Sequence, residues 1–207
     1  MELILIRHAL PVRRELVEGP ADPELSDAGL AQAQYLAKYL ASEHLDAIYT
    51  SPMRRAVQTA EPLAAATSLP LILVDDIAEL DRNASEYVPV EELRATNDPR
   101  WQQMVNNEWG TSDETQDQFD TRVHVAIDSI VERHAGQRVV VVCHGGVINS
   151  YLTEVLGLGQ SRGFFYPNYT SIHRVMISRR GQRQVATLNE TAHLRGTGLP
   201  IGMNSPL

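Results

Sequence analysis

Short, unbroken apolar runs alternate along the chain with longer segments in which apolar residues recur at helical spacing. The runs at residues 3–6 and 139–143 have the length and composition of strands buried on both faces. Further strands are expected at residues 46–50 and 69–74, and a hairpin at residues 173–177 and 184–188 with its turn near Arg180-Gly181. This alternation predicts a mainly parallel sheet covered on both faces, with antiparallel pairing near the end.

Helical patterns occupy the intervals between these strands. A helix capped by Ser26 or Asp27 should run to about Leu40, with its apolar face marked by Leu30, Ala33, Ala37 and Leu40. Ser51-Pro52 should start a second helix, because proline costs no hydrogen bond in the first turn. Two more helices are expected at residues 114–134 and 147–156. Residues 75–96 are acidic and mixed in period, and predict irregular structure.

Composition and charge narrow the class of protein. The 207 residues, 43% of them hydrophobic, predict one globular domain spanning residues 1–207. The net charge of −8 argues against nucleic acid or an anionic membrane as a partner, so an anionic substrate needs a local basic pocket. No apolar run reaches about 18 residues and no signal peptide is apparent, so we expect a soluble, cytoplasmic protein. Its oligomeric state stays open, a homodimer included.

The cysteine content limits two other kinds of site. Cys143 is the only cysteine, which excludes an internal disulfide and a metal site built from a cysteine cluster. Cys143 itself is expected to pack within its strand, because strand alternation turns it and the adjacent His144 to opposite faces.

Two histidines follow two of the apolar runs. His8 ends the first run after Arg7, and His144 ends the run at residues 139–143. Ligands bind at the carboxyl ends of strands in open α/β sheets, so the two imidazoles should face each other across one crevice. Arg54 and Arg55 come at the start of a helix that follows another strand. Helix N-termini favour anions, and the planar guanidinium of arginine matches the oxygens of phosphate or carboxylate. These residues predict a cationic cup around a phosphoryl group attacked by histidine.

The same residues carry a resemblance to the histidine phosphatases, also called the phosphoglycerate mutase-like superfamily. Arg7-His8 is similar to the family signature, and residues 51–60, which read Ser-Pro-Met-Arg-Arg-Ala-Val-Gln-Thr-Ala, are close to its second motif. The string from Val142 to Ile148 resembles the third motif. The resemblance covers most of the chain, and the order and spacing of the motifs make chance agreement improbable.

What the resemblance implies is a three-layer α/β/α sandwich with a mainly parallel central sheet, and a metal-independent phosphomonoesterase that needs no cofactor. His8 would accept the phosphoryl group of a small phosphorylated metabolite, and Arg7, Arg55, His144 and Gly145 would hold its oxygens. Glu79 best matches the acid that protonates the leaving oxygen and then activates water, which requires a raised pKa. Arg54 is expected to form a surface ion pair instead.

The chain departs from the family pattern at three places. Ala9 stands where glycine is usual, and Leu10-Pro11 replaces an acidic-hydroxyl pair. Arg14 occupies the place of an asparagine that commonly holds phosphate, and would substitute for it or reach a second anionic group. The segment after Glu79 lacks the common Gly-x-x-Glu-Gly pattern, which leaves Asp81 as the alternative acid.

Two other functions stay open on the sequence. A phosphoglycerate mutase-type phosphotransferase uses the same histidine, although the modest length of the middle segment favours hydrolysis. A noncatalytic phosphate-binding or regulatory protein would retain the cup without turnover. Residues 80–113 are expected to form a lid or specificity segment, with Trp101 and Trp109 over the substrate or in local packing. The tail from Arg195 would cover the site, pack on a partner or stay mobile.

Overall fold

A six-stranded mixed sheet forms the centre of the protein. The computed structural model describes residues 1–106, 114–159 and 163–203. The strand order is β4-β3-β6-β1-β7-β8. The first four strands in this order are parallel, and β7 and β8 pair antiparallel beyond β1. These strands span Leu71–Leu73 (β4), Ala47–Thr50 (β3), Arg138–Cys143 (β6), Glu2–Arg7 (β1), Ile172–Ile177 (β7) and Arg183–Glu190 (β8). The predicted sheet with antiparallel pairing at its end is confirmed.

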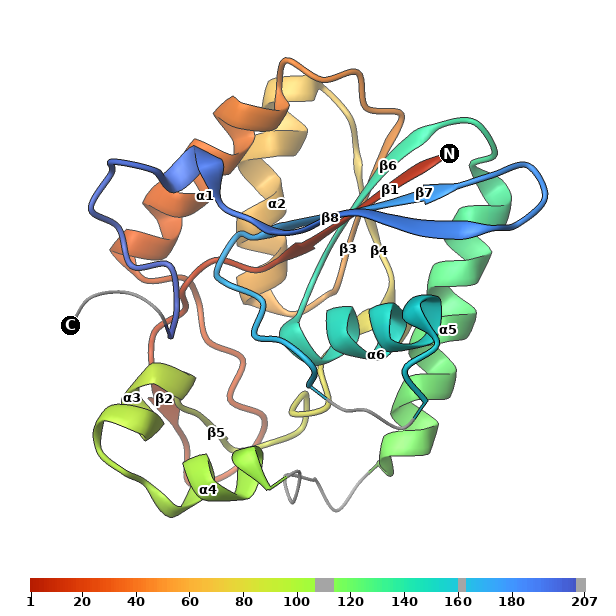
Figure 1. Cartoon of the computed structure of the whole chain (residues 1–207). Helices are drawn as coiled ribbons and strands as arrows, with labels where there is room; N and C mark the ends of the chain where they lie inside the picture. The colour runs from red at the N-terminus through yellow and green to blue at the C-terminus, as the bar shows by residue number, and fades with distance from the viewer. Residues whose placement is uncertain (107–113, 160–162, 204–207) are drawn as a thin grey trace.

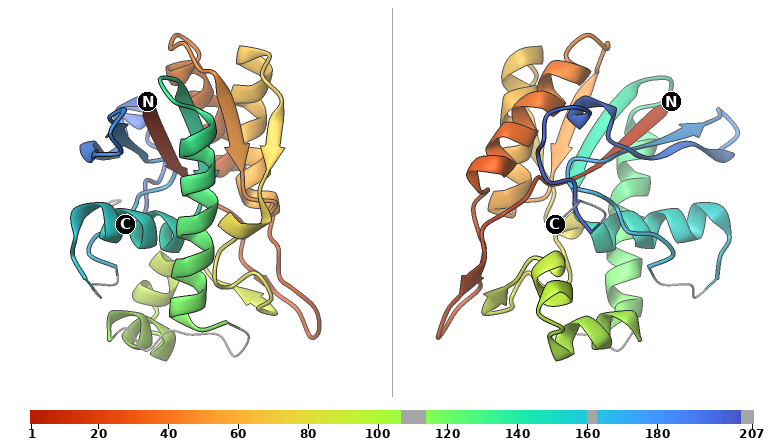
Figure 2. Two further views of the ribbon diagram at one scale, coloured as in Figure 1. Left: turned by 90° about the vertical axis from the view of Figure 1, so that its right-hand side faces the viewer. Right: turned by 60° about the vertical axis from the view of Figure 1, so that its left-hand side comes forward.

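Helices cover both faces of this sheet (Figures 1 and 2). One face packs against α1 (Asp27–Leu40) and α2 (Arg54–Thr67), and the other against α5 (Gln116–Arg133) and α6 (Gly145–Leu156). Alternation along β1 explains the two layers, since Ile4 and Ile6 pack with α1 and α2 while Leu3 and Leu5 pack with α5 and α6. The three-layer α/β/α sandwich predicted by resemblance is therefore the observed architecture.

Two local predictions on the first pair of helices are wrong. Leu30 is 46% exposed and does not belong to the buried face of α1, which includes Leu36 instead. The buried face is rotated because Gly29 and Gln32 also turn inward, toward Leu10 and the tail. The second helix begins at Arg54 rather than at Pro52, with Met53 extended at its N-cap. Ser26, and not Asp27, caps α1 by accepting the Gly29 N–H.

The segment expected to be irregular contains short elements that lie below the carboxyl edge of the sheet (Figure 1). They are η1 (Asp75–Ile77), β5 (Glu86–Tyr87) and α3 (Val90–Ala95), and α4 (Pro99–Val105) follows the segment. β5 pairs with β2 (Arg14–Glu15), so the loop after β1 is joined to this segment. A last turn, η2 (Ala192–Leu194), follows β8. In the described part of the chain, no helix is both long and apolar enough to cross a membrane.

Candidate active site

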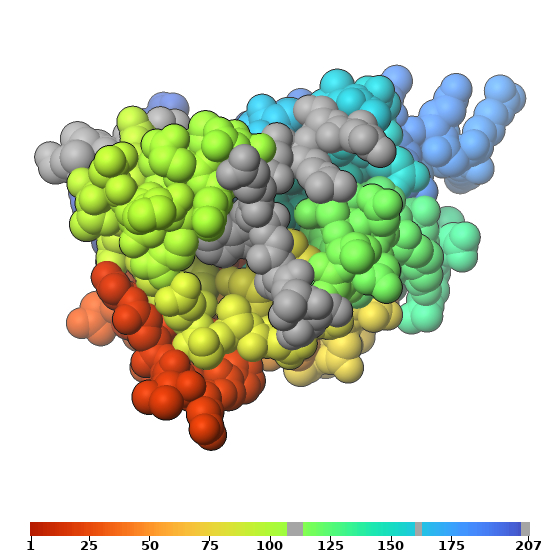
Figure 3. Space-filling view, turned by 90° about the horizontal axis from the view of Figure 1, so that it is seen from below, coloured from red at the N-terminus to blue at the C-terminus, as the bar shows by residue number. Residues whose placement is uncertain are grey.

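A cavity of about 530 Å³ opens at the carboxyl edge of the sheet. Arg7, His8, Arg55, Glu79 and Gly145 all line it. Figure 3 shows this side of the molecule, where the yellow-green residues of α3 and α4 lie beside the first turns of α5. The residues that the sequence singles out, separated by up to 138 positions, are thus brought together at one site, because parallel strands deliver their carboxyl ends to one edge.

His8 is held at the end of β1 in one defined tautomer. Its Nδ1 lies 2.8 Å from the carbonyl oxygen of Ala9, and a carbonyl only accepts, so Nδ1 carries the proton and Nε2 the lone pair. The Ala9 N–H in turn donates to Thr59 Oγ1. Burial, together with the positive charges of Arg55 and Arg7, lowers the pKa of His8 well below 6.5. The imidazole is therefore neutral near neutral pH and can act as a nucleophile.

Arg7 is clamped beside His8. Its NH1 donates to the carbonyl oxygen of Pro167 at 2.7 Å, and its guanidinium lies over the rings of Tyr166 and Tyr169. Arg7 Nε is buried without a hydrogen-bond partner among the described residues. A donor desolvated in this way is costly unless a ligand accepts its proton, which favours an anion in the cavity.

Arg55 lies in the first turn of α2 and is 1% exposed. Its NH2 donates to Asp81 Oδ1 at 2.9 Å, and its guanidinium lies over the ring of Tyr87. Nε and NH1 have no partner within the described part of the protein. Asp81 thus neutralises and orients Arg55 and leaves two buried donors for an anion. This contact favours a positioning role for Asp81, and its role as the alternative acid stays a prediction.

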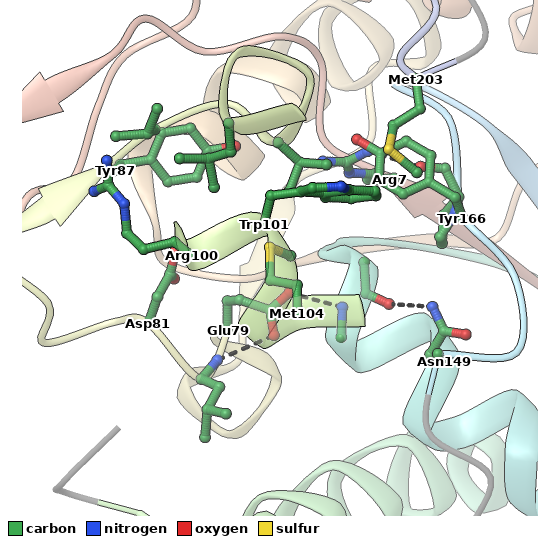
Figure 4. A pocket seen from close by; sticks show the side chains of 18 of the residues that line it. Arg7, Glu79, Asp81, Tyr87, Arg100, Trp101, Met104, Asn149, Tyr166 and Met203 are labelled. Atoms are coloured by element: carbon green, nitrogen blue, oxygen red, sulfur yellow. Dashed lines mark hydrogen bonds between the residues drawn. The ribbon is translucent and has the colours of Figure 1, made fainter. Parts of the chain in front are cut away.

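Glu79 is partly buried between the end of η1 and the start of α6. Its Oε2 accepts the Gly146 N–H at 2.8 Å and its Oε1 accepts the Leu80 N–H at 3.0 Å (Figure 4). Burial, followed by the charge of Asp81, raises the pKa of Glu79 above 4.5, against the lowering effect of the two N–H groups and Arg55. A partly buried carboxyl with a raised pKa suits general acid catalysis.

His144 lies behind His8 rather than in the wall of the cavity. The two rings are 5.2 Å apart between centroids, and His144 is fully buried. Its Nε2 is 2.7 Å from Ser51 Oγ, whereas Nδ1 has no partner in the described structure. Burial, followed by Arg55 and His8, lowers the pKa of His144 well below 6.5. Ser51, which the motif contained without an assigned role, therefore orients this ring.

The remaining sequence candidates fall outside the cavity wall. Arg14 NH2 binds Glu24 Oε2 at 2.7 Å, and Arg54 NH1 binds the same oxygen at 3.0 Å. The surface ion pair expected for Arg54 is thus observed, while Arg14 is not placed among the groups around His8 and its role in phosphate binding stays a prediction. Cys143 is fully buried in β6, as expected. In the regions that the structure describes, no group of three or more acidic, histidine or cysteine side chains could hold a metal ion.

Much of the cavity wall is apolar and was missed by motif reasoning. Trp101 and Met104 point into it from α4, and Met203 reaches it from the tail (Figure 4). Described residues of the segment 80–113 line the cavity, and Trp109 lies outside the described residues. The role of this segment as a lid or specificity segment stays a prediction. Aromatic residues clustered after Glu79 were the available signal for this wall. Nothing in the pattern of the tail indicated Met203.

Comparison with known proteins identifies the class. A family model described as the histidine phosphatase superfamily, branch 1, matches residues 3–191. The chain therefore belongs to this superfamily. It is 32% identical over 201 residues, 94% of each chain, to phosphoserine phosphatase 1 of Hydrogenobacter thermophilus. This family and this similarity make the protein a phosphatase, so the noncatalytic alternative is not favoured.

Two further proteins are similar to this chain. It is 28% identical over 163 residues, 76% of each chain, to a probable phosphoglycerate mutase of Yersinia pestis. A mutant phosphoserine phosphatase of Entamoeba histolytica, solved in complex with phosphoserine, superposes with a TM-score of 0.72 at 22% identity, covering 93% of this chain and 98% of that one. The second similarity establishes the fold.

Proposed function

We propose that this phosphatase hydrolyses the monoester of a small phosphorylated metabolite through a phosphohistidine on His8, without a metal ion. The observation that carries the proposal is the tautomer of His8. The Nδ1–H bond to Ala9 leaves a lone pair on Nε2, in a ring kept neutral by burial and by two neighbouring arginines. The relatives named for phosphoserine and phosphoglycerate support a small phosphorylated substrate.

In the first step, His8 Nε2 forms a bond to phosphorus and the bond from phosphorus to the ester oxygen breaks. Protonated Glu79 gives its proton to that oxygen, so the alcohol leaves neutral. The unpartnered donors of Arg7 and Arg55 neutralise the equatorial oxygens as charge moves onto them. His144 supports the same oxygens or holds the ring of His8, against which it packs.

In the second step, the Glu79 carboxylate accepts a proton from water, and the resulting oxygen attacks phosphorus. The bond between phosphorus and Nε2 breaks, which releases inorganic phosphate and restores neutral His8 and protonated Glu79. The two steps use Glu79 first as an acid and then as a base, and a pKa raised toward the working pH serves both.

The test is hydrolysis of a generic aryl phosphate in the presence of a chelator, with rapid quenching to trap an acid-labile phosphoprotein. We expect turnover and an adduct, both lost in His8→Asn. His44→Asn is the matched control, because the His44 side chain is 86% exposed and does not line the cavity. An adduct that persists in His8→Asn would contradict the proposed nucleophile. Phosphoryl transfer to an added hydroxy acid in preference to water would instead identify a mutase.

A further inference from the structure

The cavity has two chemically different ends. Charged groups gather where β1, α2 and α6 converge, and they account for the phosphoryl group. Away from them the wall is built largely from apolar and aromatic side chains, among them Leu93, Trp101, Met104, Phe119 and Met203. In the close-up, Trp101 lies across the middle of the cavity, with Met104 beside it on the side toward Glu79 (Figure 4). The alcohol that is esterified to the phosphoryl group would lie at this end.

Among the lining residues that the structure describes, the apolar end offers no uncommitted positive charge for a carboxylate. Apart from His8, Arg7 and Arg55, the cationic side chain in the described wall is Arg100. Its NH2 binds Asp98 Oδ2 and its NH1 binds Glu86 Oε1, both at 2.8 Å. Its Nε also donates to Asp98. Two carboxylates therefore already neutralise Arg100, and the Arg100 contacts hold the pKa of Asp98 at about 2.

We propose that the leaving group is an uncharged, apolar alcohol of at least ring size, so that the substrate is the phosphate monoester of an aryl-alkyl or similarly hydrophobic alcohol. This inference rests on the proposed function and names its substrate class. A volume of about 530 Å³ falls within the range of sites for drug-sized ligands. An amino acid or hydroxy acid ester, as in phosphoserine or 3-phosphoglycerate, would place a carboxylate against this wall, where the described lining residues provide no free cation to pair it.

The deciding experiment compares esters whose leaving groups have similar chemical reactivity. The values of kcat/KM are measured for 2-naphthylmethyl phosphate, ethyl phosphate, phosphoserine and 3-phosphoglycerate. We expect the naphthylmethyl ester to exceed ethyl phosphate by at least about tenfold, because each added apolar group that fills such a pocket contributes about tenfold or more. It should also exceed both carboxylate-bearing esters.

Variants of the wall test its direct contribution. Trp101→Ala should lower kcat/KM for the naphthylmethyl ester by about tenfold and leave ethyl phosphate within roughly twofold of wild type. Met104→Ala provides a second, smaller truncation on the same helix in case the first variant does not fold. Val125→Ala is the matched control, since Val125 is 65% exposed on α5 and outside the cavity. It should change neither ester.

Two results would overturn the inference. One is a kcat/KM for phosphoserine or 3-phosphoglycerate equal to or above that of the naphthylmethyl ester. The other is an equal loss for ethyl and naphthylmethyl phosphates in the wall variants. If no ester is hydrolysed, the proposed function fails, and the inference is decided by calorimetry with 2-naphthylmethylphosphonate and ethylphosphonate. Tighter binding of the naphthyl compound supports an apolar subsite, and equal Kd values overturn it.

Discussion

The backbone N–H of Gly146 donates a 2.8 Å hydrogen bond to Glu79 Oε2, and a Cβ atom at position 146 would lie 2.3 Å from Glu79 Oε1. Glycine at this place in α6 therefore lets the helix approach the carboxyl closely enough to hold it. The helix backbone, rather than another side chain, fixes where Glu79 lies.

Gly146→Ala should lower kcat for an alkyl phosphate by about tenfold or more, because the methyl group displaces the carboxyl that serves as acid and base. Alanine is the better helix former, so loss of the helix would not explain the defect. Steady-state kinetics of Gly146→Ala, Glu79→Gln and the double variant test the mechanism. If the methyl group acts through Glu79, the double variant is no slower than Glu79→Gln. Additive losses would contradict this.

Arg55→Lys should lower kcat/KM by about a hundredfold, because the ammonium group cannot both pair with Asp81 and offer the two donors that Nε and NH1 now present. Arg54→Lys is the neighbouring control. Arg54 is half-exposed and bound to Glu24, so its replacement should leave kcat/KM within roughly twofold of wild type. The comparison requires only initial rates with one substrate. Equal losses in the two variants would mean that general positive charge, and not the buried fork of Arg55, matters.

The rate of hydrolysis of an alkyl phosphate should fall as pH rises through the raised pKa of Glu79, because the carboxyl loses the proton that the leaving oxygen needs. The lowered pKa of His8 keeps its ring unprotonated below pH 6.5, so no loss of the nucleophile is expected near that value on the acid side. Profiles of kcat from about pH 4 to 8 for wild type and Glu79→Gln measure this. In Glu79→Gln the phosphate ester still ionises, with a pKa of about 6, so the profile of the variant shows the pH dependence that comes from the substrate alone. Profiles of identical shape would contradict the role of Glu79.

The free energy of unfolding should fall in mild acid because of His173, which lies outside the cavity. Burial lowers the pKa of His173 from 6.5 to about 3, while its Nδ1 accepts the Asn189 N–H and its Nε2 binds Ser171 Oγ. Below pH 6.5 the unfolded chain binds a proton that the folded one does not. The free energy of unfolding therefore drops by at most about 1.4 kcal/mol per pH unit from this residue, down to its folded pKa.

Urea unfolding of wild type and His173→Gln at pH 7 and at pH 5 measures this contribution. The variant should be less stable at pH 7, where the packed neutral ring is lost, and should lose less stability on acidification. His44→Gln, which alters an exposed imidazole, should show the wild-type dependence. An unchanged pH dependence in His173→Gln would remove His173 from the explanation of acid sensitivity.

The centre of the sheet was predictable because β1 and β6 contain unbroken apolar runs that end at polar residues. Burial on both faces demands that pattern, so Val139 to Cys143 could be placed at the centre of the sheet from composition alone. Helix boundaries were less secure. Pro52 satisfies the rule for a first turn, yet the extended backbone at Met53 delays α2 until Arg54.

The sequence predicted which cationic and histidine side chains would gather at the site. It did not predict the residues that orient them or the residues of the apolar wall. His8 and His144 follow strands, so their convergence follows from sheet topology. The contact of Asp81 with Arg55 joins segments 26 positions apart and depends on irregular backbone after η1, which no periodicity specifies. The position of Met203 was harder still to predict from the sequence, because it depends on how the tail folds back across the molecule to bind Gln32.

One part of the chain provides the proposed reactive groups of the cavity, and another part provides its apolar wall. Natural selection can therefore act on the chemistry and on substrate preference separately. The groups proposed to perform the reaction stand at the ends of sheet strands and adjoining helices, where substitutions disturb the core. Trp101 and Met104 belong to the short helix α4, none of whose residues is fully buried. Exchanges on that helix can redirect substrate preference during evolution while the inherited chemistry stays intact, and the same helix is the natural target for laboratory diversification.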